Sequence, residues 1–214
     1  MPYSTLNQNL IDDVPLVYAF DVARWKEMPP HDPSEDISKL TFTMNLPKHA
    51  YILDVGCGVG RWVKPLLERG VAGYVGVDNC HEMIAHARKT FPALDFRLGD
   101  IRHISRIVDG SIKFDGFIAE KCLMHVPTDD IDKTLSGIRQ LLTAGACGRI
   151  STTYGQGRRI LTHPANLHVP PGRRLLIEQW TPETLEPHLR GAGFEISGTP
   201  VIDKKVFSVI VRAV

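Results

Sequence analysis

The segment ILDVGCGVGRW, residues 52–62, decides how this chain folds. A short apolar run that carries Asp54 gives way to three glycines at every second position, Gly56, Gly58 and Gly60, and a helical pattern follows. Such a run, ended by glycine, is typical of a buried strand in a parallel sheet. Glycine lets the backbone turn tightly and approach a ligand without an intervening Cβ. The segment therefore predicts a strand, a ligand-binding turn and a helix.

The glycine spacing leaves two kinds of adenosyl cofactor open. A dinucleotide-binding turn has the pattern G-x-G-x-x-G, which would require glycine where this chain has Arg61. Here the third glycine comes one position earlier, at Gly60. The turn alone is weak evidence, so the residues on the neighbouring strands have to separate the alternatives.

Two further acids follow the next two predicted strands. Asp78 closes the second strand, where a carboxylate can accept hydrogen bonds from both hydroxyls of a ribose. Asp100 comes just after the third strand, and beside the backbone N–H of Ile101 it can read an adenine edge. Because ligands of open α/β sheets bind at the carboxyl ends of the strands, we expect Asp54, Asp78 and Asp100 to line one crevice.

The rest of the chain alternates short apolar segments with helical ones, which predicts an α/β, doubly wound sheet. Strands are predicted at residues 51–55, 74–77, 95–98, 114–120, 148–153, 194–199 and 205–214. Too few residues separate the last two for a helical crossover, so they should pair antiparallel. We therefore expect a mostly parallel seven-stranded sheet with an antiparallel last strand and helices on both faces.

Two regions differ from this pattern. Residues 1–47 are predicted to be helical, with a break at MPPHDP, residues 28–33. Residues 155–179 show no clear periodicity and are predicted to be a loop insertion on the substrate side. Four arginines in this loop either recognise a carboxylate or phosphate on a substrate or only solvate the loop, and these are Arg158, Arg159, Arg173 and Arg174.

Composition excludes several classes of protein. The 214 residues are 43% hydrophobic, enough for one globular core, and the net charge of +1 disfavours a general nucleic-acid binder. The four cysteines form no C-x-x-C pair, so we expect reduced thiols, no metal site and a cytoplasmic protein. Neither a secretory signal nor an apolar run of ~20 residues is visible, so no membrane association is expected.

The whole arrangement resembles the class I S-adenosylmethionine-dependent methyltransferases. The resemblance covers about residues 51–214 and rests on D-x-G-C-G-x-G at 54–60, on Asp78 and on the G-D pair that ends at Asp100. It continues through FDGFIAEKCLMHVP, LLTAGACGRIS and the late WTPETL and GAGFE segments. One departure is TAGACG, residues 143–148, where the family commonly has a proline followed by paired glycines.

The resemblance implies S-adenosyl-L-methionine as cofactor, S-adenosyl-L-homocysteine as product, and a Rossmann-like methyltransferase domain at residues 48–214. It makes residues 1–47 an N-terminal helical lid, with Tyr18, Arg24 and Trp25 either over the cofactor or in ordinary packing. It also implies a cofactor-binding set of Asp54, Gly56, Cys57, Gly58, Arg61, Asp78, Asn79, Met83, Asp100, Ile101, Ala119 and Glu120. Glu120 could equally form a local ion pair with Lys121.

Two residues are candidates for catalysis. His125 follows the fourth strand and could take a proton from a hydroxyl or amine, although a histidine there could also only shape the pocket. Tyr154 follows the fifth strand and could contact the substrate.

The predicted activity is methyl transfer to an O or N atom of a small-molecule acceptor by in-line displacement. The chain has neither the N-P-P-Y-like segment of nucleic-acid amine methyltransferases nor the P-C dipeptide of cytosine methylation. The acceptor is predicted to be a small molecule, with an anionic group on it as one alternative, and the enzyme is predicted to be a monomer or homodimer. Alternatives are a nicotinamide-dependent oxidoreductase, which would not explain Asp100, and a non-catalytic cofactor-binding protein.

Overall fold

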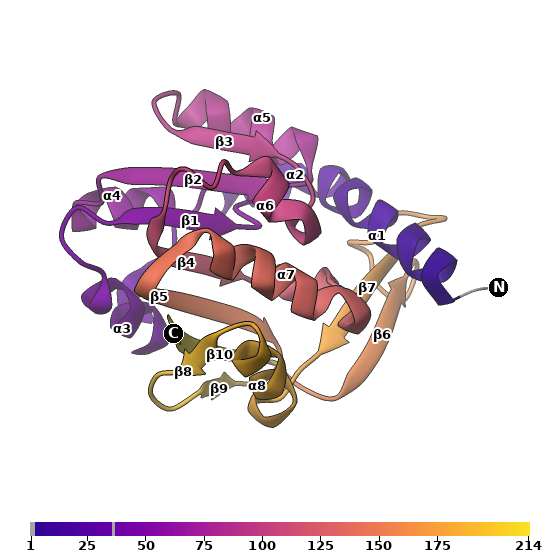
Figure 1. Cartoon of the computed structure of the whole chain (residues 1–214). Coiled ribbons are helices and arrows are strands. Elements are labelled where there is room, and N and C mark those ends of the chain that lie inside the picture. The colour runs from indigo at the N-terminus through magenta and orange to yellow at the C-terminus, as the bar shows by residue number, and fades with distance from the viewer. Residues whose placement is uncertain (1–2, 36) are drawn as a thin grey trace.

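The centre of the fold is a sheet whose inner strands are covered on both faces (Figure 1). The computed structural model describes residues 3–35 and 37–214, and within them eight strands join this sheet. Apolar residues such as Leu53 and Ile118 are fully buried, as expected for strands between two layers of helices. The strands are β1 (Tyr51–Val55), β2 (Gly73–Asp78), β3 (Asp95–Leu98), β4 (Phe114–Glu120), β5 (Leu142–Thr153), β8 (Phe194–Ile196), β9 (Val201–Asp203) and β10 (Val206–Ala213).

The strand order is β3-β2-β1-β4-β5-β10-β8, with β9 paired to β10. Strands β1 to β5 run parallel, whereas β10 is antiparallel to β5, β8 and β9. The predicted mostly parallel sheet with an antiparallel end is therefore confirmed. This sheet has eight strands instead of the predicted seven, because the sequence analysis missed β9, which is too short to show a pattern. The order reverses between β1 and β4, and ligands of such sheets bind beside that point.

Helices cover both faces of the sheet (Figure 1). Helices α6, α7 and α8 bury their apolar residues in one large cluster, and α3, α4 and α5 do so in a second cluster on the other side. These helices are α3 (Ile37–Asn45), α4 (Val63–Arg69), α5 (His81–Thr90), α6 (Ile104–Ile107), α7 (Thr128–Gln140) and α8 (Pro182–Gly191), and the 3-10 turns are η1 (Pro33–Glu35), η2 (Ile101–His103) and η3 (Leu123–His125).

The N-terminal segment is helical, as predicted. It forms α1 (Tyr3–Phe20) and α2 (Val22–Glu27), and the chain leaves the helical conformation before Pro33. Of the predicted lid, residues 1, 2 and 36 lie outside the described part. No described helix combines the length and the hydropathy that a bilayer crossing requires.

The predicted loop at residues 155–179 is instead built around an antiparallel hairpin of β6 (Gly157–Thr162) and β7 (Arg174–Gln179). Leu175 and Ile177 in β7 pack against Val14 and Val17 of α1. This contact with a helix about 160 residues earlier stabilises the hairpin, and the local pattern of the sequence could not reveal it.

The hairpin arginines are used largely in holding the fold together. Arg158 pairs with buried Glu178 across the hairpin, and Arg173 pairs with Asp13 of α1 at 3.1 Å. The first of these acids also accepts a hydrogen bond from the backbone N–H of Thr128 at the start of α7. Arg173 therefore joins the hairpin to the N-terminal helix, and Glu178, which Arg158 holds in place, joins it to α7.

The TAGACG segment also differs in detail from its prediction. Helix α7 ends at Gln140 and β5 already begins at Leu142, six residues before the predicted strand. Gly145 has a φ of +77°, and the pairing register between β4 and β5 shifts between Phe114 and Gly116. The departure from the family pattern thus coincides with an irregular start of β5.

Gly148 offers a test of the packing between β4 and β5. A Cβ at this position would lie 1.9 Å from Cε1 of the fully buried Phe117. Gly148→Ala should therefore lower the free energy of unfolding by ~1–3 kcal/mol, because a tightly packed core has no room for a further methyl group. Urea denaturation measures the loss. Gly110→Ala is the control, since a Cβ there meets nothing within 4 Å, and an equal effect of both variants would contradict this packing.

Candidate active site

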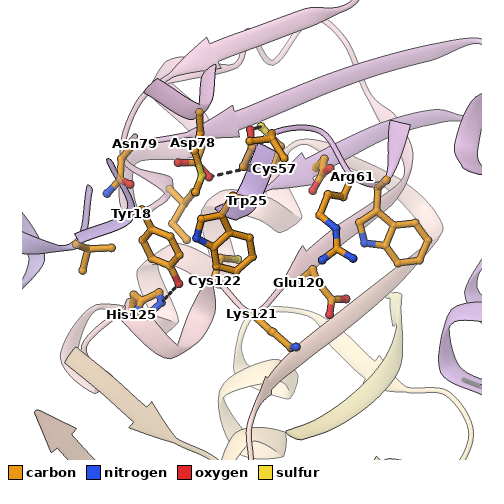
Figure 2. A pocket seen from close by; sticks show the side chains of 18 of the residues that line it. Tyr18, Trp25, Cys57, Arg61, Asp78, Asn79, Glu120, Lys121, Cys122 and His125 are labelled. Atoms are coloured by element: carbon orange, nitrogen blue, oxygen red, sulfur yellow. Dashed lines mark hydrogen bonds between the residues drawn. The ribbon is translucent and has the colours of Figure 1, made fainter. Parts of the chain in front are cut away.

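A pocket of about 260 Å³ lies at the carboxyl ends of β1, β2 and β4, beneath the N-terminal helices (Figure 2). The predicted cofactor-binding residues all line it except Ala119, whose side chain is buried within the sheet. His125 lines the pocket, and so do Tyr18, Arg24 and Trp25 from the N-terminal segment. The three acids predicted to share one crevice, Asp54, Asp78 and Asp100, are indeed brought together.

The glycine turn adopts a backbone that other residues rarely adopt. Gly56, Gly58 and Gly60 have φ angles of +71°, +53° and +83°. A Cβ at Gly56 would lie 2.4 Å from the Cβ of Cys122, so no larger residue fits there. The backbone N–H groups of Gly56 and Cys57 donate to the carbonyl of Val77 at 2.8 and 3.1 Å. These bonds fix the turn against the end of β2.

Asp78 holds the turn from the other side. Its carboxylate accepts a hydrogen bond from the backbone N–H of Gly58 at 2.9 Å (Figure 2). It also accepts one from the backbone N–H of Cys80 at 2.8 Å. Burial raises the pKa of Asp78, and the backbone N–H donors oppose that shift. The bond to Cys80 fixes Asp78 at the start of α5, because Cys80 is the residue immediately before that helix. Asp78 also lines the pocket, so its structural role and ligand binding are compatible.

Asp54 is buried at the end of β1, only 1% exposed. Tyr74 donates its hydroxyl hydrogen to this carboxylate at 2.7 Å. Burial raises the pKa of Asp54 to about 7, and the nearby Asp78 and Glu120 act in the same direction. Sequence reasoning missed Tyr74, because its side chain reaches Asp54 only when β1 and β2 pair.

Asp100 is held by its own neighbour. Arg102 donates to this carboxylate from its backbone N–H at 2.9 Å and from its guanidinium at 2.6 and 2.9 Å. The same guanidinium pairs with Asp130 of α7 at 3.2 Å. Asp100 therefore caps η2 and is fixed in place, with Ile101 beside it in the pocket wall.

Glu120 pairs with Arg149 of β5, a residue that sequence reasoning missed. Arg149 is 1% exposed, donates to Ser208 at 3.1 Å and lies 5.7 Å from the ring of Trp62. The two ion-pair partners are 29 residues apart in the sequence, so only the pairing of β4 with β5 brings them together. No ion pair between Glu120 and Lys121 is found within the described residues.

His125 connects three parts of the chain. Its Nδ1 lies 2.7 Å from the carbonyl oxygen of Leu176, and its Nε2 lies 2.7 Å from the hydroxyl of Tyr18 (Figure 2). A carbonyl only accepts, so Nδ1–H donates to Leu176 and Nε2 accepts from Tyr18. Burial lowers the pKa of His125 to about 4 and raises the pKa of Tyr18. His125 is thus neutral, and the hydroxyl of Tyr18 occupies its basic nitrogen, Nε2.

The N-terminal segment forms one wall of the pocket. Tyr18 and Trp25 lie with their ring centroids 5.6 Å apart, and Trp25 lies over the middle of the pocket in Figure 2. Arg61 donates from Nε to the carbonyl of Pro29 at 2.7 Å, and the backbone N–H of His31 donates back to the carbonyl of Arg61 at 3.0 Å. These bonds hold the segment after α2 against the glycine turn.

Other predicted substrate contacts lie elsewhere. Tyr154 does not line the pocket, and its side chain packs against the apolar cluster formed with α7 and α8. The four hairpin arginines also lie outside the pocket lining. A direct role for Tyr154 therefore stays a prediction. The hairpin arginines do not lie where they could contact an anionic acceptor in this pocket.

Comparison with known proteins agrees with this geometry. Residues 52–145 match a family model described as a methyltransferase domain. No sequence among curated proteins matches the chain well enough to count as a relative. The matched segment is less than half of the chain, and it contains the glycine turn, Asp78 and Asp100, so these residues of the pocket lie where the chain is similar to a methyltransferase domain.

Solved structures share this fold at low sequence identity. The DhpI–SAH complex is 19% identical, covers 96% of this chain and 98% of its own, and superposes with a TM-score of 0.72. A SAM-dependent methyltransferase from Methanosarcina mazei is 18% identical, covers 81% and 96%, and has a TM-score of 0.67. The glycopeptide N-methyltransferase MtfA complexed with sinefungin is 15% identical, covers 82% and 92%, and has a TM-score of 0.63.

The burial of Asp54 has a consequence for stability. Its pKa of about 7 lies above the usual value near 4, so between these values the folded state holds a proton that the unfolded chain has lost. The free energy of unfolding should therefore fall as the pH rises from ~4 to ~7. Asp54→Asn removes this effect and keeps an acceptor for Tyr74, so it should be more stable than the parent at pH 8, by on the order of 2–4 kcal/mol.

Denaturant unfolding at pH 5 and pH 8 measures this difference. The exposed Asp203 provides the control, because Asp203→Asn should change the free energy of unfolding little at either pH. A gain for Asp54→Asn that is the same at both pH values would contradict the assignment to a titrating carboxyl.

Proposed function

We propose that this protein transfers the methyl group of S-adenosyl-L-methionine to an oxygen or nitrogen atom of a small acceptor by in-line displacement. The observation that carries the proposal is the meeting of the glycine turn, Asp78 and Asp54 in one pocket beneath Trp25. The cofactor supplies an electrophilic methyl group on a sulfonium. The residues of the chain have to bind it, orient the acceptor and exclude water.

The residues present fit this cofactor. The turn is a cradle that a Cβ at Gly56 would fill, so backbone rather than side chain faces the bound molecule. Asp78 would hold the ribose hydroxyls, and Asp100 with Ile101 would hold the adenine. Asp54, whose second oxygen has no protein donor among the described residues, would hold the methionine ammonium. Since the pKa of Asp54 is about 7, that contact should weaken as the pH falls below 7.

The further cofactor contacts follow from position. Gly58, Cys57 and Arg61 would face the methionine half, whereas Asn79 and Met83 would flank the nucleoside. Glu120 would lie near the sulfonium but is already paired with Arg149. Ala119 would act only through the backbone, because its side chain is fully buried.

Catalysis would rest mainly on positioning. His125 could accept a proton only by relay, with Tyr18 passing its own hydrogen to Nε2 while it takes one from the acceptor. The pKa of about 4 makes His125 a weak base, although methyl transfer to a hydroxyl would produce a strongly acidic oxonium that a weak base can deprotonate; an amine acceptor would lose its proton to water instead. Orientation by Tyr18 and His125 is therefore the role that the geometry supports best.

The proposal also covers the kind of acceptor, the cellular compartment and the oligomeric state. A pocket of about 260 Å³ walled by Tyr18 and Trp25 fits a small molecule better than a polymer. All four cysteines are unpaired, as suits a reducing compartment such as the cytoplasm. The protein would act as a monomer or homodimer. An oxidoreductase is disfavoured, because a nicotinamide cofactor needs neither Asp100 nor the antiparallel β10.

Replacement of Asp78 tests the cofactor assignment. Asp78→Ala should weaken binding of S-adenosyl-L-homocysteine by at least ~1–3 kcal/mol, because the ribose hydroxyls lose a charged acceptor and the turn loses its anchor. Isothermal titration calorimetry measures the affinity, with Asp203→Ala as an exposed control. Unchanged affinity, or tight NAD binding by a parent that ignores S-adenosyl-L-homocysteine, would refute the proposal.

Replacement of Tyr18 tests whether α1 closes the pocket. Tyr18→Phe removes the hydrogen bond to His125, worth ~0.5–1.5 kcal/mol, so S-adenosyl-L-homocysteine should dissociate roughly 2–10-fold faster. Stopped-flow fluorescence of Trp25 would follow its release. Tyr51→Phe, at an exposed tyrosine outside the pocket, should release it at the parental rate; a parental rate for Tyr18→Phe as well would exclude the closing contact.

A further inference from the structure

The pocket is electrically divided. Figure 2 shows Asp78 and Asn79 toward one end, Arg61, Glu120 and Lys121 toward the other, and Trp25 between them. Glu120 does not neutralise Arg61 and Lys121 at this second end, because it is already paired with buried Arg149. We refer to the end formed by His31, Arg61, Trp62 and Lys121 as the cationic end.

Two cations at this end face the pocket without a carboxylate partner. Among the described residues, no ion pair within 4.0 Å involves Arg61 or Lys121, although both line the pocket. Arg61 uses Nε for the carbonyl of Pro29, and the rest of its guanidinium points into the pocket in Figure 2. Burial lowers the pKa of this guanidinium, and the charges of Glu120 and Glu35, neither of which forms an ion pair with Arg61, only oppose that shift.

Buried polar atoms without partners lie at the same end. Trp62 is 2% exposed and lines the pocket, and within the described part of the chain its indole N–H finds no acceptor. Nδ1 of His31 is likewise buried and unpartnered, and the two rings lie 5.1 Å apart. Buried donors are nearly always satisfied in folded proteins, so an unsatisfied one in a pocket wall indicates a ligand.

The environment of His31 reports the local potential. Burial first, and then Arg61, Lys39, Arg149 and Lys121, lower the pKa of His31 to about 2. Burial thus keeps His31 neutral, and of the four cations Arg61 and Lys121, which have no carboxylate partner among the described residues, add positive potential beside it. An anion entering that region would be stabilised both by the charges and by the free indole N–H.

Lys121 also has an unusual backbone. Its φ is +53°, in the left-handed region that favours glycine, directly after the end of β4. Strained residues of this kind persist where the surrounding structure fixes them, and they cluster at functional sites. Glycine would be less strained here, so the position places an ammonium group at the pocket at a conformational cost.

We propose that the cationic end binds an oxyanion of the methyl acceptor, with Lys121 as its anchor, so that the acceptor carries a carboxylate or phosphate group. This inference rests on the proposed function. S-adenosyl-L-methionine brings only one carboxylate, which Arg61 would hold beside the glycine turn. Lys121, which follows β4 on the side of His125, then remains for a second anion. It would determine specificity by orienting the acceptor.

Inorganic phosphate is the probe for the first experiment. It is titrated into the protein saturated with S-adenosyl-L-homocysteine, at constant ionic strength, while the fluorescence of Trp25 and Trp62 in the pocket wall is recorded. The parent should show saturable binding, and Lys121→Gln should weaken it about tenfold or more. Lys204→Gln is the matched control, because Lys204 also has a left-handed backbone, with φ of +54°, but lies outside the pocket.

A second titration separates the two sources of a carboxylate. 5′-Methylthioadenosine shares the nucleoside of S-adenosyl-L-homocysteine but lacks its amino-acid end. Arg61→Gln should weaken binding of S-adenosyl-L-homocysteine and leave that of methylthioadenosine unchanged, whereas Lys121→Gln should change neither more than about twofold. Loss of S-adenosyl-L-homocysteine affinity in Lys121→Gln alone would assign Lys121 to the cofactor and overturn the inference.

The remaining outcomes are also decisive. Absence of saturable phosphate binding to the parent complex, or equal binding in Lys121→Gln, would overturn the inference while leaving cofactor binding intact. A parent that binds no S-adenosyl-L-homocysteine would instead refute the proposed function. Lys121→Gly guards against misfolding, because it relieves the left-handed backbone; it should be at least as stable as the parent and still lose phosphate affinity.

Discussion

The hydrogen bonds from the Asp78 carboxylate to the backbone N–H groups of Gly58 and Cys80 are the constraint on which the site depends. They join the glycine turn after β1 to the end of β2 and to the start of α5. The turn needs this anchor because its three glycines have the freest backbones of all residues. A carboxylate there thus organises the turn first, and it can then present its remaining lone pairs to a ligand.

Several buried charges around the pocket are compensated by partners from distant strands. Tyr74 donates to Asp54, and Arg149 pairs with Glu120. Each acid would otherwise be expensive to bury. Since these acids are neutralised or hydrogen-bonded within the protein, the charges that remain toward the pocket are few. The charges that remain uncompensated lie at opposite ends of the pocket, with Asp78 at one end and Arg61 and Lys121 at the other.

The N-terminal helix, the sheet domain and the hairpin meet at one histidine. Tyr18 of α1 donates to His125, and His125 donates to the carbonyl of Leu176 in β7. His125 lines the pocket, and the sequence predicted it to be either a general base or a residue that only shapes the pocket. Its partners lie 107 and 51 residues away, so no local pattern could show that both ring nitrogens are occupied.

By itself the sequence determined the features that depend on near neighbours: the apolar strands, the glycine turn, and the acids at Asp54, Asp78 and Asp100. These follow from backbone sterics and from burial patterns a few residues long. Only the tertiary structure decided the features that depend on strand pairing and packing, namely Arg149 against Glu120, the β6–β7 hairpin against α1, and Tyr154 outside the pocket. Side chains there meet partners far away in the sequence, and their energy exists only once the sheet has formed.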